Sequence, residues 1–299
     1  GKGEEGQMKR ILITGTQGYV GKSLANYLNR WPEKYRVDFL SLRGDDWRQA
    51  DFDRVDAIVH AAAIVHQPKS KDDPSQAEIY DRVNHRLTAE LAKKAKAEGV
   101  SQFLFLSSES VYGLHAPVGQ TLPITADTPL HPTDNYGISK LKAEEALAAL
   151  RGDGFRVAIL RPPMIYGKGC KGNYQTLARL AGKLPVFPKV ANRRSMLYIG
   201  SLCEFLRLLI EDSADGTFCP QNAEYVSTSR MVQEIAKAHG KNIRLVGGCT
   251  WALKLLSHVT SLAGKAFGSL CYDKSLSDYP TNYNLVSFQQ SIAETEGRP

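Results

Sequence analysis

A tyrosine and a lysine four residues apart are well suited to acid–base chemistry. Tyr136 and Lys140 stand in the run YGISKLKAEEALAAL, whose apolar residues recur at three- and four-residue steps and predict a helix over residues 136–150. Residues four apart share a helix face, so we expect the ammonium beside the phenol. The cation favours the phenolate, so we expect a lowered pKa for Tyr136, suited to deprotonating a sugar or alcohol hydroxyl. The same spacing also arises by accident on exposed helices, so the surrounding motifs must decide.

A glycine-rich turn follows the first apolar run of the chain. Residues 10–14 predict a strand, Gly15, Gly18 and Gly21 come next, and a helical pattern follows them. A strand, a glycine loop and a helix in this order are typical of the first unit of a dinucleotide-binding sheet. Gly15 permits the tight turn, and Gly18 lets backbone N–H groups approach a pyrophosphate at the helix N-terminus. Gly21 lets the helix pack closely on the strand. The cofactor contacts that we predict in this loop also include Gln17, Tyr19 and Val20.

The end of the second predicted strand, residues 35–42, bears on the choice between NAD and NADP. In NAD-binding sheets an acidic residue commonly binds the adenosine ribose at this place. Here the strand end carries Ser41, with Arg43 two residues later. A hydroxyl and a guanidinium suit a ribose 2′-phosphate, and a solvated turn arginine is an equally good interpretation. Asp46 and Trp47 are expected to cover the adenine.

Two later strands also end in residues that suit a ligand site. The strand predicted at residues 56–63 ends in three small residues that leave room for a cofactor, Ala61, Ala62 and Ala63. His60 in that strand is interpreted as a packing residue. The strand predicted at residues 103–106 runs directly into Ser107 and Ser108. Ligands bind at the carboxyl ends of strands in a doubly wound sheet, so we expect these serines at the cofactor crevice.

Strands and helices alternate along the chain as far as residue 167. A further strand is predicted at residues 155–160 and a long helix at residues 76–98. The alternation predicts the α/β class, with a Rossmann-type doubly wound parallel sheet. Beyond residue 167 short segments replace it and predict a smaller C-terminal lobe. We therefore expect a dinucleotide-binding domain at residues 8–167, with 195–212 returning to it, and a substrate-binding lobe at residues 168–194 and 213–296.

Composition argues against several other classes of protein. The five cysteines are scattered and never form a CxxC pair, which favours free thiols in a reducing cytoplasm over disulfides or a metal site. No run approaches the roughly 20 apolar residues of a membrane span. The formal net charge is +7, but the basic residues are interleaved with acidic ones. We interpret most of this charge as solvated surface and expect no nucleic-acid partner.

Three motifs in the same order resemble one enzyme family. They are the glycines spaced GxxGxxG, the stretch SSESVYG at residues 107–113, and the Tyr-x-x-x-Lys pair. Together they resemble the extended short-chain dehydrogenase/reductase family, in particular the nucleotide-sugar epimerase/dehydratase branch that contains UDP-galactose 4-epimerase. Residues 161–173 and 192–199 resemble a surface-polysaccharide subgroup that holds UDP-hexose 4-epimerases and 4-keto-sugar reductases.

The resemblance implies roles for individual residues. Tyr136 would be the acid/base, and Lys140 would bind the nicotinamide ribose and lower the pKa of Tyr136. Ser108 matches the catalytic serine that bonds the substrate oxygen, and Asn84 matches an asparagine that supports the active site. The remaining implied contacts are with the substrate, at Ser110 and at the diphosphate-binding positions Asn173 and Arg194, and with the cofactor, at Pro163 and Ile165.

Three activities fit these residues. The first is a UDP-hexose 4-epimerase that holds NAD and passes through a 4-keto sugar, with Tyr136 as the acid/base. The second is an NADPH-dependent reductase of a 4-keto-6-deoxy sugar nucleotide, which Arg43 favours. The third, a dinucleotide-sensing protein without catalysis, fits less well because the serine, tyrosine and lysine are all present. The family also implies a homodimer, formed through the helices at residues 76–98 and 136–150.

Overall fold

The computed structural model describes residues 7–15, 17–63, 72–259 and 266–297. These residues form two compact units. The first comprises Gly1–Gly113, Leu130–Arg161 and Cys203–Phe218, and the second comprises Leu114–Pro129, Pro162–Leu202 and Cys219–Pro299. Compared with the expected division, residues 114–129 and 162–167 belong to the second unit, and the returning segment is 203–218 in place of 195–212.

The first unit is built on a parallel sheet of six strands in the order β10-β6-β4-β3-β1-β2. Its strands are β1 (Lys9–Thr14), β2 (Tyr35–Leu40), β3 (Ala57–His60), β4 (Gln102–Leu106), β6 (Arg156–Leu160) and β10 (Gly216–Phe218). Neighbouring strands are parallel throughout. The chain runs outward from β1 to β2 and then crosses to β3 on the other side of β1. The carboxyl ends of β1 and β3 are thus the point where ligands bind in such sheets. The predicted Rossmann-type sheet is confirmed.

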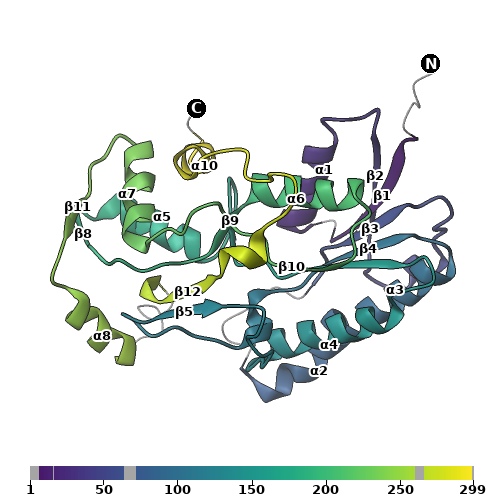
Figure 1. Ribbon diagram of the computed structural model, residues 1–299, viewed down its shortest axis with the longest axis horizontal. Helices are drawn as coiled ribbons and strands as arrows, with labels where there is room; N and C mark the ends of the chain where they lie inside the picture. Colours follow the sequence, from purple (N-terminus) through teal and green to yellow (C-terminus); the bar gives the residue numbers. More distant parts are fainter. Residues whose placement is uncertain (1–6, 16, 64–71, 260–265, 298–299) are drawn as a thin grey trace. The chain divides into compact units, whose positions relative to one another are not determined.

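Helices cover both faces of this sheet. In Figure 1, α3 (Leu87–Ala97) and α4 (Asn135–Leu150) lie on one face, and α1 (Tyr19–Leu28) and α6 (Ile199–Glu211) on the other. The predicted long helix at residues 76–98 begins as α2 (Ala77–Tyr80) and passes through a π-helical turn, η3 (Asp81–Arg86), into α3. The turn η1 (Asp46–Gln49) follows β2, and η4 (Glu109–Tyr112) follows β4.

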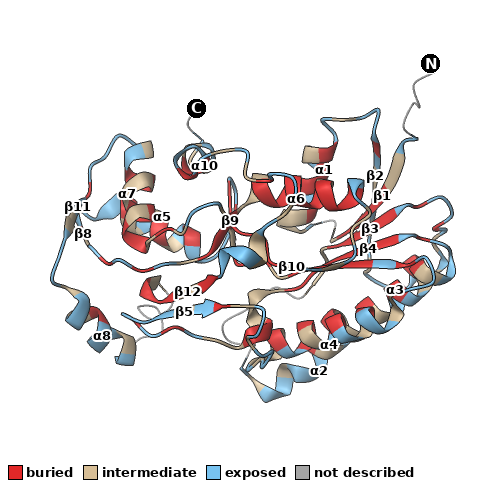
Figure 2. Cartoon of the chain, in the orientation of Figure 1, coloured by how far each residue is buried: buried red, intermediate tan, exposed pale blue. Residues whose placement is uncertain are grey.

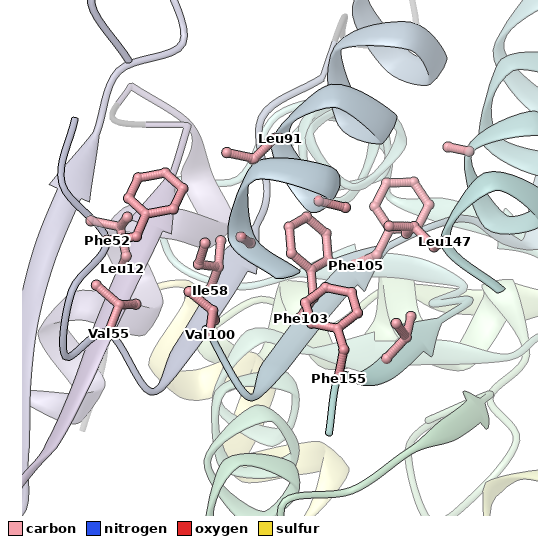
Figure 3. Close-up of a cluster of buried hydrophobic side chains, with 14 of the residues drawn as sticks. Leu12, Phe52, Val55, Ile58, Leu91, Val100, Phe103, Phe105, Leu147 and Phe155 are labelled. Carbon is pink, nitrogen blue, oxygen red and sulfur yellow. The ribbon is translucent and has the colours of Figure 1, made fainter. Parts of the chain in front are cut away.

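Aromatic and aliphatic side chains fill the space between the sheet and the helices α3 and α4. Figure 3 shows Phe103, Phe105 and Phe155 among them, with Leu91 from α3 and Leu147 from α4. The rings of Phe103 and Phe155 have centroids 6.2 Å apart. Figure 2 shows the strands beneath as buried, which explains why they read as nearly continuous apolar runs. This core fixes α4 against the sheet.

The second unit consists of short paired strands and helices. The pairs are β5 (Thr121–Ile124) with β12 (Ser269–Tyr272), β7 (Met164–Tyr166) with β9 (Met196–Tyr198), and β8 (Val186–Pro188) with β11 (Arg244–Val246). The helices of this unit are α5 (Asn173–Lys183), α7 (Thr228–Ala238), α8 (Thr250–Val259) and α10 (Phe288–Thr295). It also contains the short turn η5 (Lys274–Ser277), and a similar turn, η2 (Pro74–Gln76), lies in the first unit. No helix in the described part of the chain is long and apolar enough to cross a bilayer.

Candidate active site

The glycine loop lies at the carboxyl end of β1 and packs against the segment that follows β3. Gly15 has a φ of +77°, and a Cβ there would lie 3.0 Å from the backbone nitrogen of Ala62. A Cβ on Gly21 would lie 2.9 Å from the Gly15 carbonyl oxygen, so α1 approaches the loop as only glycine allows. The N–H of Gly18 donates to the Gly15 carbonyl at 2.9 Å, and α1 begins at Tyr19 without a side-chain cap. An N-terminus of this kind suits a phosphate.

Thr14 ties the ends of β1 and β3 together. Its hydroxyl oxygen accepts the backbone N–H groups of Ala61 at 3.0 Å and Ala62 at 3.2 Å. The hydroxyl proton is then free to be donated to Nδ1 of His60, 2.8 Å away. Thr14 is fully buried, and His60 is 1 % exposed. The small residues after β3 are therefore held in place by the last residue of β1.

His60 continues this chain of hydrogen bonds to the helix layer. Its Nε2 lies 2.8 Å from the Thr88 hydroxyl, which donates to the backbone carbonyl of Asn84 at 2.9 Å. Because Thr88 gives its proton to a carbonyl, Nε2 must carry the ring hydrogen, which assigns the neutral tautomer. Burial, helped by the nearby Lys140 cation, lowers the pKa of His60 to about 3. His60 thus stays neutral and links β3 to Asn84.

Asn84 lies in the π-helical turn and reaches the start of α4. Its side chain is 1 % exposed, and its Nδ2 donates to the Ser139 hydroxyl at 3.1 Å. Ser139 in turn donates to the backbone carbonyl of Tyr136 at 2.8 Å. A π-helical turn shifts the side chains that follow it and is frequent at functional sites. The asparagine singled out in the sequence therefore contacts the backbone of the tyrosine-bearing turn through Ser139.

Tyr136 lies in the first turn of α4, beside Ser108. Asp134 caps this helix by accepting the N–H of Gly137 at 2.7 Å. A Cβ on Gly137 would lie 2.7 Å from the carbonyl oxygen of Ser110, so glycine lets α4 approach η4 closely. The Tyr136 phenol is hydrogen-bonded to Ser108, and the Ser108 hydroxyl donates to that of Ser110 at 2.9 Å. The structure thus brings together three of the predicted residues.

The electrostatics around Tyr136 differ from the expectation. Burial raises the pKa of Tyr136 to about 12; the Ser108 hydrogen bond acts against this shift, and the charge of Asp134 adds to it. Lys140 Nζ lies 5.6 Å from the centre of the Tyr136 ring and donates to the carbonyl of Leu106 at 2.7 Å. The prediction that Lys140 lowers the pKa of Tyr136 is therefore wrong. Burial raises this pKa, and the Lys140 ammonium is bound to the Leu106 carbonyl.

Lys140 is itself perturbed by its surroundings. It is 4 % exposed, and burial lowers its pKa to about 8, although the Glu144 carboxylate acts against this shift. Its ammonium also lies 4.9 Å from the centre of the Phe105 ring, where a cation is attracted by the aromatic face. At neutral pH most of the Lys140 population still carries its charge, which is available one helical turn from Tyr136.

A buried ion pair behind the site was not singled out in the sequence. Glu144 and Arg161 are joined by contacts of 2.5 to 3.1 Å, and their side chains are only 5 % and 13 % exposed. Arg161 also donates to the Tyr112 hydroxyl at 3.0 Å, and Ser107 donates to Glu144 at 2.5 Å. Their positions in the sequence could have indicated this pair. Glu144 lies one helical turn beyond Lys140, and Arg161 directly follows β6, as Ser107 follows β4.

Residues predicted to contact the adenosine half of the cofactor fall into two groups. Ser41, Arg43 and Asp46 are exposed, and the Ser41 hydroxyl accepts the N–H of Arg43 at 3.3 Å. Trp47 is 1 % exposed and belongs to the core under α3, with the Arg48 guanidinium 4.4 Å from its ring centre. The expectation that Trp47 covers the adenine is therefore wrong, because its side chain is buried in that core.

The other predicted ligand residues belong to the second unit. Asn173 is the exposed first residue of α5, and Arg194 donates to the carbonyl of Ala266 at 3.4 Å. Pro163 is buried, and Ile165 is half-buried in β7. Their roles toward the substrate and the cofactor remain predictions.

Comparison with known proteins agrees with the resemblance. Residues 11–226 match the model of the NAD dependent epimerase/dehydratase family. The UDP-glucose 4-epimerase of Vibrio cholerae is 33% identical over 287 residues, which covers 89% of this chain and 84% of that protein. The GDP-6-deoxy-D-mannose reductase of Pseudomonas aeruginosa is 31% identical over 233 residues, covering 70% and 73%.

A solved structure supports the fold independently of close sequence likeness. A dTDP-4-dehydrorhamnose reductase from Clostridium acetobutylicum matches with a TM-score of 0.72 at 19% identity, covering 96% of this chain and 98% of that one. The relatives include both epimerases and reductases, so the comparisons leave the individual reaction open. They do establish that this chain is an enzyme of the extended short-chain dehydrogenase/reductase type and belongs to the NAD dependent epimerase/dehydratase family.

Proposed function

We propose that this chain is a nucleotide-sugar 4-epimerase that acts on a UDP-hexose with bound NAD. The observation that carries the proposal is the grouping of Ser108, Tyr136 and Lys140 at the carboxyl end of β4, within one unit. The 33% identical relative from Vibrio cholerae, a UDP-glucose 4-epimerase, supports this choice of reaction.

The loop between β1 and α1 fits a dinucleotide. Gly15 and Gly21 leave no room for side chains, and the uncapped start of α1 offers backbone N–H groups to a pyrophosphate. Ala61 and Ala62, held by Thr14, place only methyl groups beside this loop. The dinucleotide, when bound, supplies the hydride acceptor and, in its oxidised form, a positive charge on the nicotinamide ring.

In this proposal the chain's own groups move the proton and hold the oxygen. Tyr136 takes the proton of the sugar 4-hydroxyl and returns it at the end of the cycle. Ser108 donates a hydrogen bond to the same oxygen as its charge changes. Lys140 keeps a positive charge beside the phenol. Because burial holds the pKa of Tyr136 near 12, deprotonation requires additional positive charge from the bound ligand.

Tyr136 and Arg43 also fit a second candidate, an NADPH-dependent reductase of a 4-keto sugar nucleotide. Tyr136 is protonated at neutral pH, as an unperturbed phenol is, and can donate its proton to a carbonyl oxygen. The exposed Arg43 beside Ser41 also suits a 2′-phosphate. The 31% identical reductase from Pseudomonas aeruginosa supports this reading.

The nucleotide that the purified protein retains distinguishes the two activities. An epimerase regenerates its cofactor and keeps NAD through purification, whereas a reductase must exchange NADP after each turnover. We therefore expect bound NAD, and interconversion of UDP-glucose and UDP-galactose, or of their N-acetyl forms, without net consumption of NADH or NADPH. Tyr136→Phe should abolish this interconversion and leave nucleotide retention intact. Stoichiometric oxidation of NADPH with a 4-keto sugar nucleotide would replace the epimerase proposal by the reductase.

We also propose a homodimer formed through α3 and α4, on the basis of the family resemblance. Both helices pack one face on the sheet and expose the other, which leaves an outward surface for a second copy. Light scattering in solution should give twice the chain mass of 33.0 kDa. A mass of one chain at micromolar concentration would contradict this proposal.

A further inference from the structure

Helix α8 of the second unit exposes its apolar side chains. The exposed fractions are 68 % for Trp251, 60 % for Leu255, 49 % for Leu256 and 81 % for Val259. Leu253 alone among its large apolar residues is buried, at 6 %. Figure 2 shows α8 as largely exposed, unlike α7, whose inner face is buried. Four large apolar side chains on three turns of one helix form an apolar patch on the protein surface.

The arrangement around the helix axis is the reverse of an ordinary surface helix. With 100° between successive residues, Trp251, Leu255, Val259 and Leu256 fall within an arc of about 140°. Leu253 lies outside this arc and packs inward. A surface helix of a globular protein normally turns its apolar stripe to the core and its polar face to water. Here the apolar arc is the outward one, so it is suited to a partner that is itself apolar.

The charged residues of α8 and of the segment that leads into it have one sign. Between residues 241 and 259 the sequence contains Lys241, Arg244 and Lys254 but no Asp or Glu. All three cations are exposed, and Lys254 borders the apolar arc on the helix itself. A second copy of the same helix face would bring one Lys254 toward the other, which disfavours self-association. An anionic surface with an apolar layer beneath it complements both features.

We propose that α8 docks this protein on an anionic lipid bilayer. Trp251, Leu255, Leu256 and Val259 enter the boundary between headgroups and acyl chains, and Lys254, Arg244 and Lys241 lie at the lipid phosphates. An amphipathic helix in the plane of the interface binds through buried apolar area together with attraction to anionic lipids. Tryptophan is enriched at this depth because its ring is apolar and its N–H polar. The proposal concerns a helix of the second unit, whereas Ser108, Tyr136 and Lys140 belong to the first, and it does not rest on the proposed activity.

Flotation with lipid vesicles tests the docking directly. We expect the full-length protein to float with vesicles that contain phosphatidylglycerol and to remain unbound with pure phosphatidylcholine. Replacing Leu255 and Val259 together by Ser should weaken binding at least about tenfold, since each loses most of its apolar contact with the bilayer. Lys254→Gln should weaken binding roughly fivefold, the share of one cation near an anionic surface.

A matched control separates docking from general stickiness. Leu285 is 62 % exposed and lies outside α8, so Leu285→Ser removes a comparable exposed leucine without touching the helix. This variant should float like the unmodified protein, and every variant should keep the melting temperature of the unmodified protein.

Three results would overturn the proposal. One is the absence of flotation with anionic vesicles, and another is an equal loss in Leu285→Ser. The third is a dimer in light scattering that Leu255→Ser dissociates, which would assign α8 to a contact between copies of this chain.

Discussion

This protein should lose stability in mild acid, because His60 binds a proton readily in the unfolded chain but not in the folded one. His60 is 1 % exposed, and both of its ring nitrogens are occupied by hydrogen bonds to Thr14 and Thr88. A proton on Nδ1 would break the bond from the Thr14 hydroxyl and place an uncompensated charge in the core. The perturbation that we consider is a change of pH, with the variant His60→Gln as the reference.

The magnitude follows from the two pKa values of this imidazole. In the unfolded chain the pKa of a histidine is about 6.5, and in the fold burial lowers the pKa of His60 to about 3. Between these values the unfolded state binds a proton that the folded state does not, so acid favours unfolding. The stability is fully present above about pH 6.5 and is lost progressively as the pH falls toward 3. At about pH 5 the loss is about 2 kcal/mol, and this figure requires only that the folded pKa lie well below 5.

Denaturant unfolding at about pH 7.5 and about pH 5 measures this loss for both proteins. His60→Gln should be less stable at the higher pH by about 1–3 kcal/mol, because it disturbs a buried hydrogen-bond chain. It lacks the titrating group, however, so the gap between the two proteins should shrink by about 2 kcal/mol at about pH 5. The other histidines contribute equally to both curves and cancel. A gap that is the same at both pH values would refute the assignment of a neutral, tautomerically fixed His60.

Three further predictions concern the ion pair, the start of α4 and the cofactor. Arg161→Met should lower the free energy of unfolding by about 3–5 kcal/mol, because it leaves the buried Glu144 carboxylate without its partner. Adding Glu144→Leu should recover most of that loss in denaturant unfolding. A single variant as stable as the double variant would contradict this. Gly137→Ala should cost about 1–3 kcal/mol and reduce turnover, because its Cβ would lie 2.7 Å from the Ser110 carbonyl oxygen; an unchanged melting temperature would show that α4 can move away freely. Arg43→Ala should weaken binding of NADPH about tenfold and leave NADH unaffected if the guanidinium holds a 2′-phosphate, and equal effects on both, measured by fluorescence titration, would remove that role.

Periodicity and local motifs were sufficient to predict the main features of the first unit. The helix at residues 136–150 was found from its three- and four-residue steps, and the structure has it at Asn135–Leu150. The glycine loop was found because three glycines follow directly on an apolar strand. These features are local, since the residues that determine them lie within one element or at its boundary. The serines at 107 and 108 were found in the same way, from their place after a strand.

Features that depend on long-range packing could not be read in this way. Trp47 follows β2 within a polar stretch, and nothing in that stretch tells which face of the sheet its indole will occupy. Glu144 and Arg161 are 17 residues apart, and their pairing requires α4 to lie beside the end of β6. The raised pKa of Tyr136 comes from burial by the surrounding chain, which the spacing of two residues on a helix does not contain.

The charge of Lys140 also depends on neighbours far away in the sequence. Glu144 lies on the next turn of α4 and would largely neutralise the ammonium if it were unpaired, but its carboxylate is bound by Arg161. His60, on the other side, is kept neutral partly by Lys140 itself, since a second cation nearby is unfavourable. Lys140, whose charge the proposed reaction requires, thus helps to keep His60 neutral. Neutral His60 in turn holds Thr88, and Thr88 holds the turn of Asn84. Lys140 and His60 therefore influence one another, so the effects of variants at these two residues on the free energy of unfolding should not be additive.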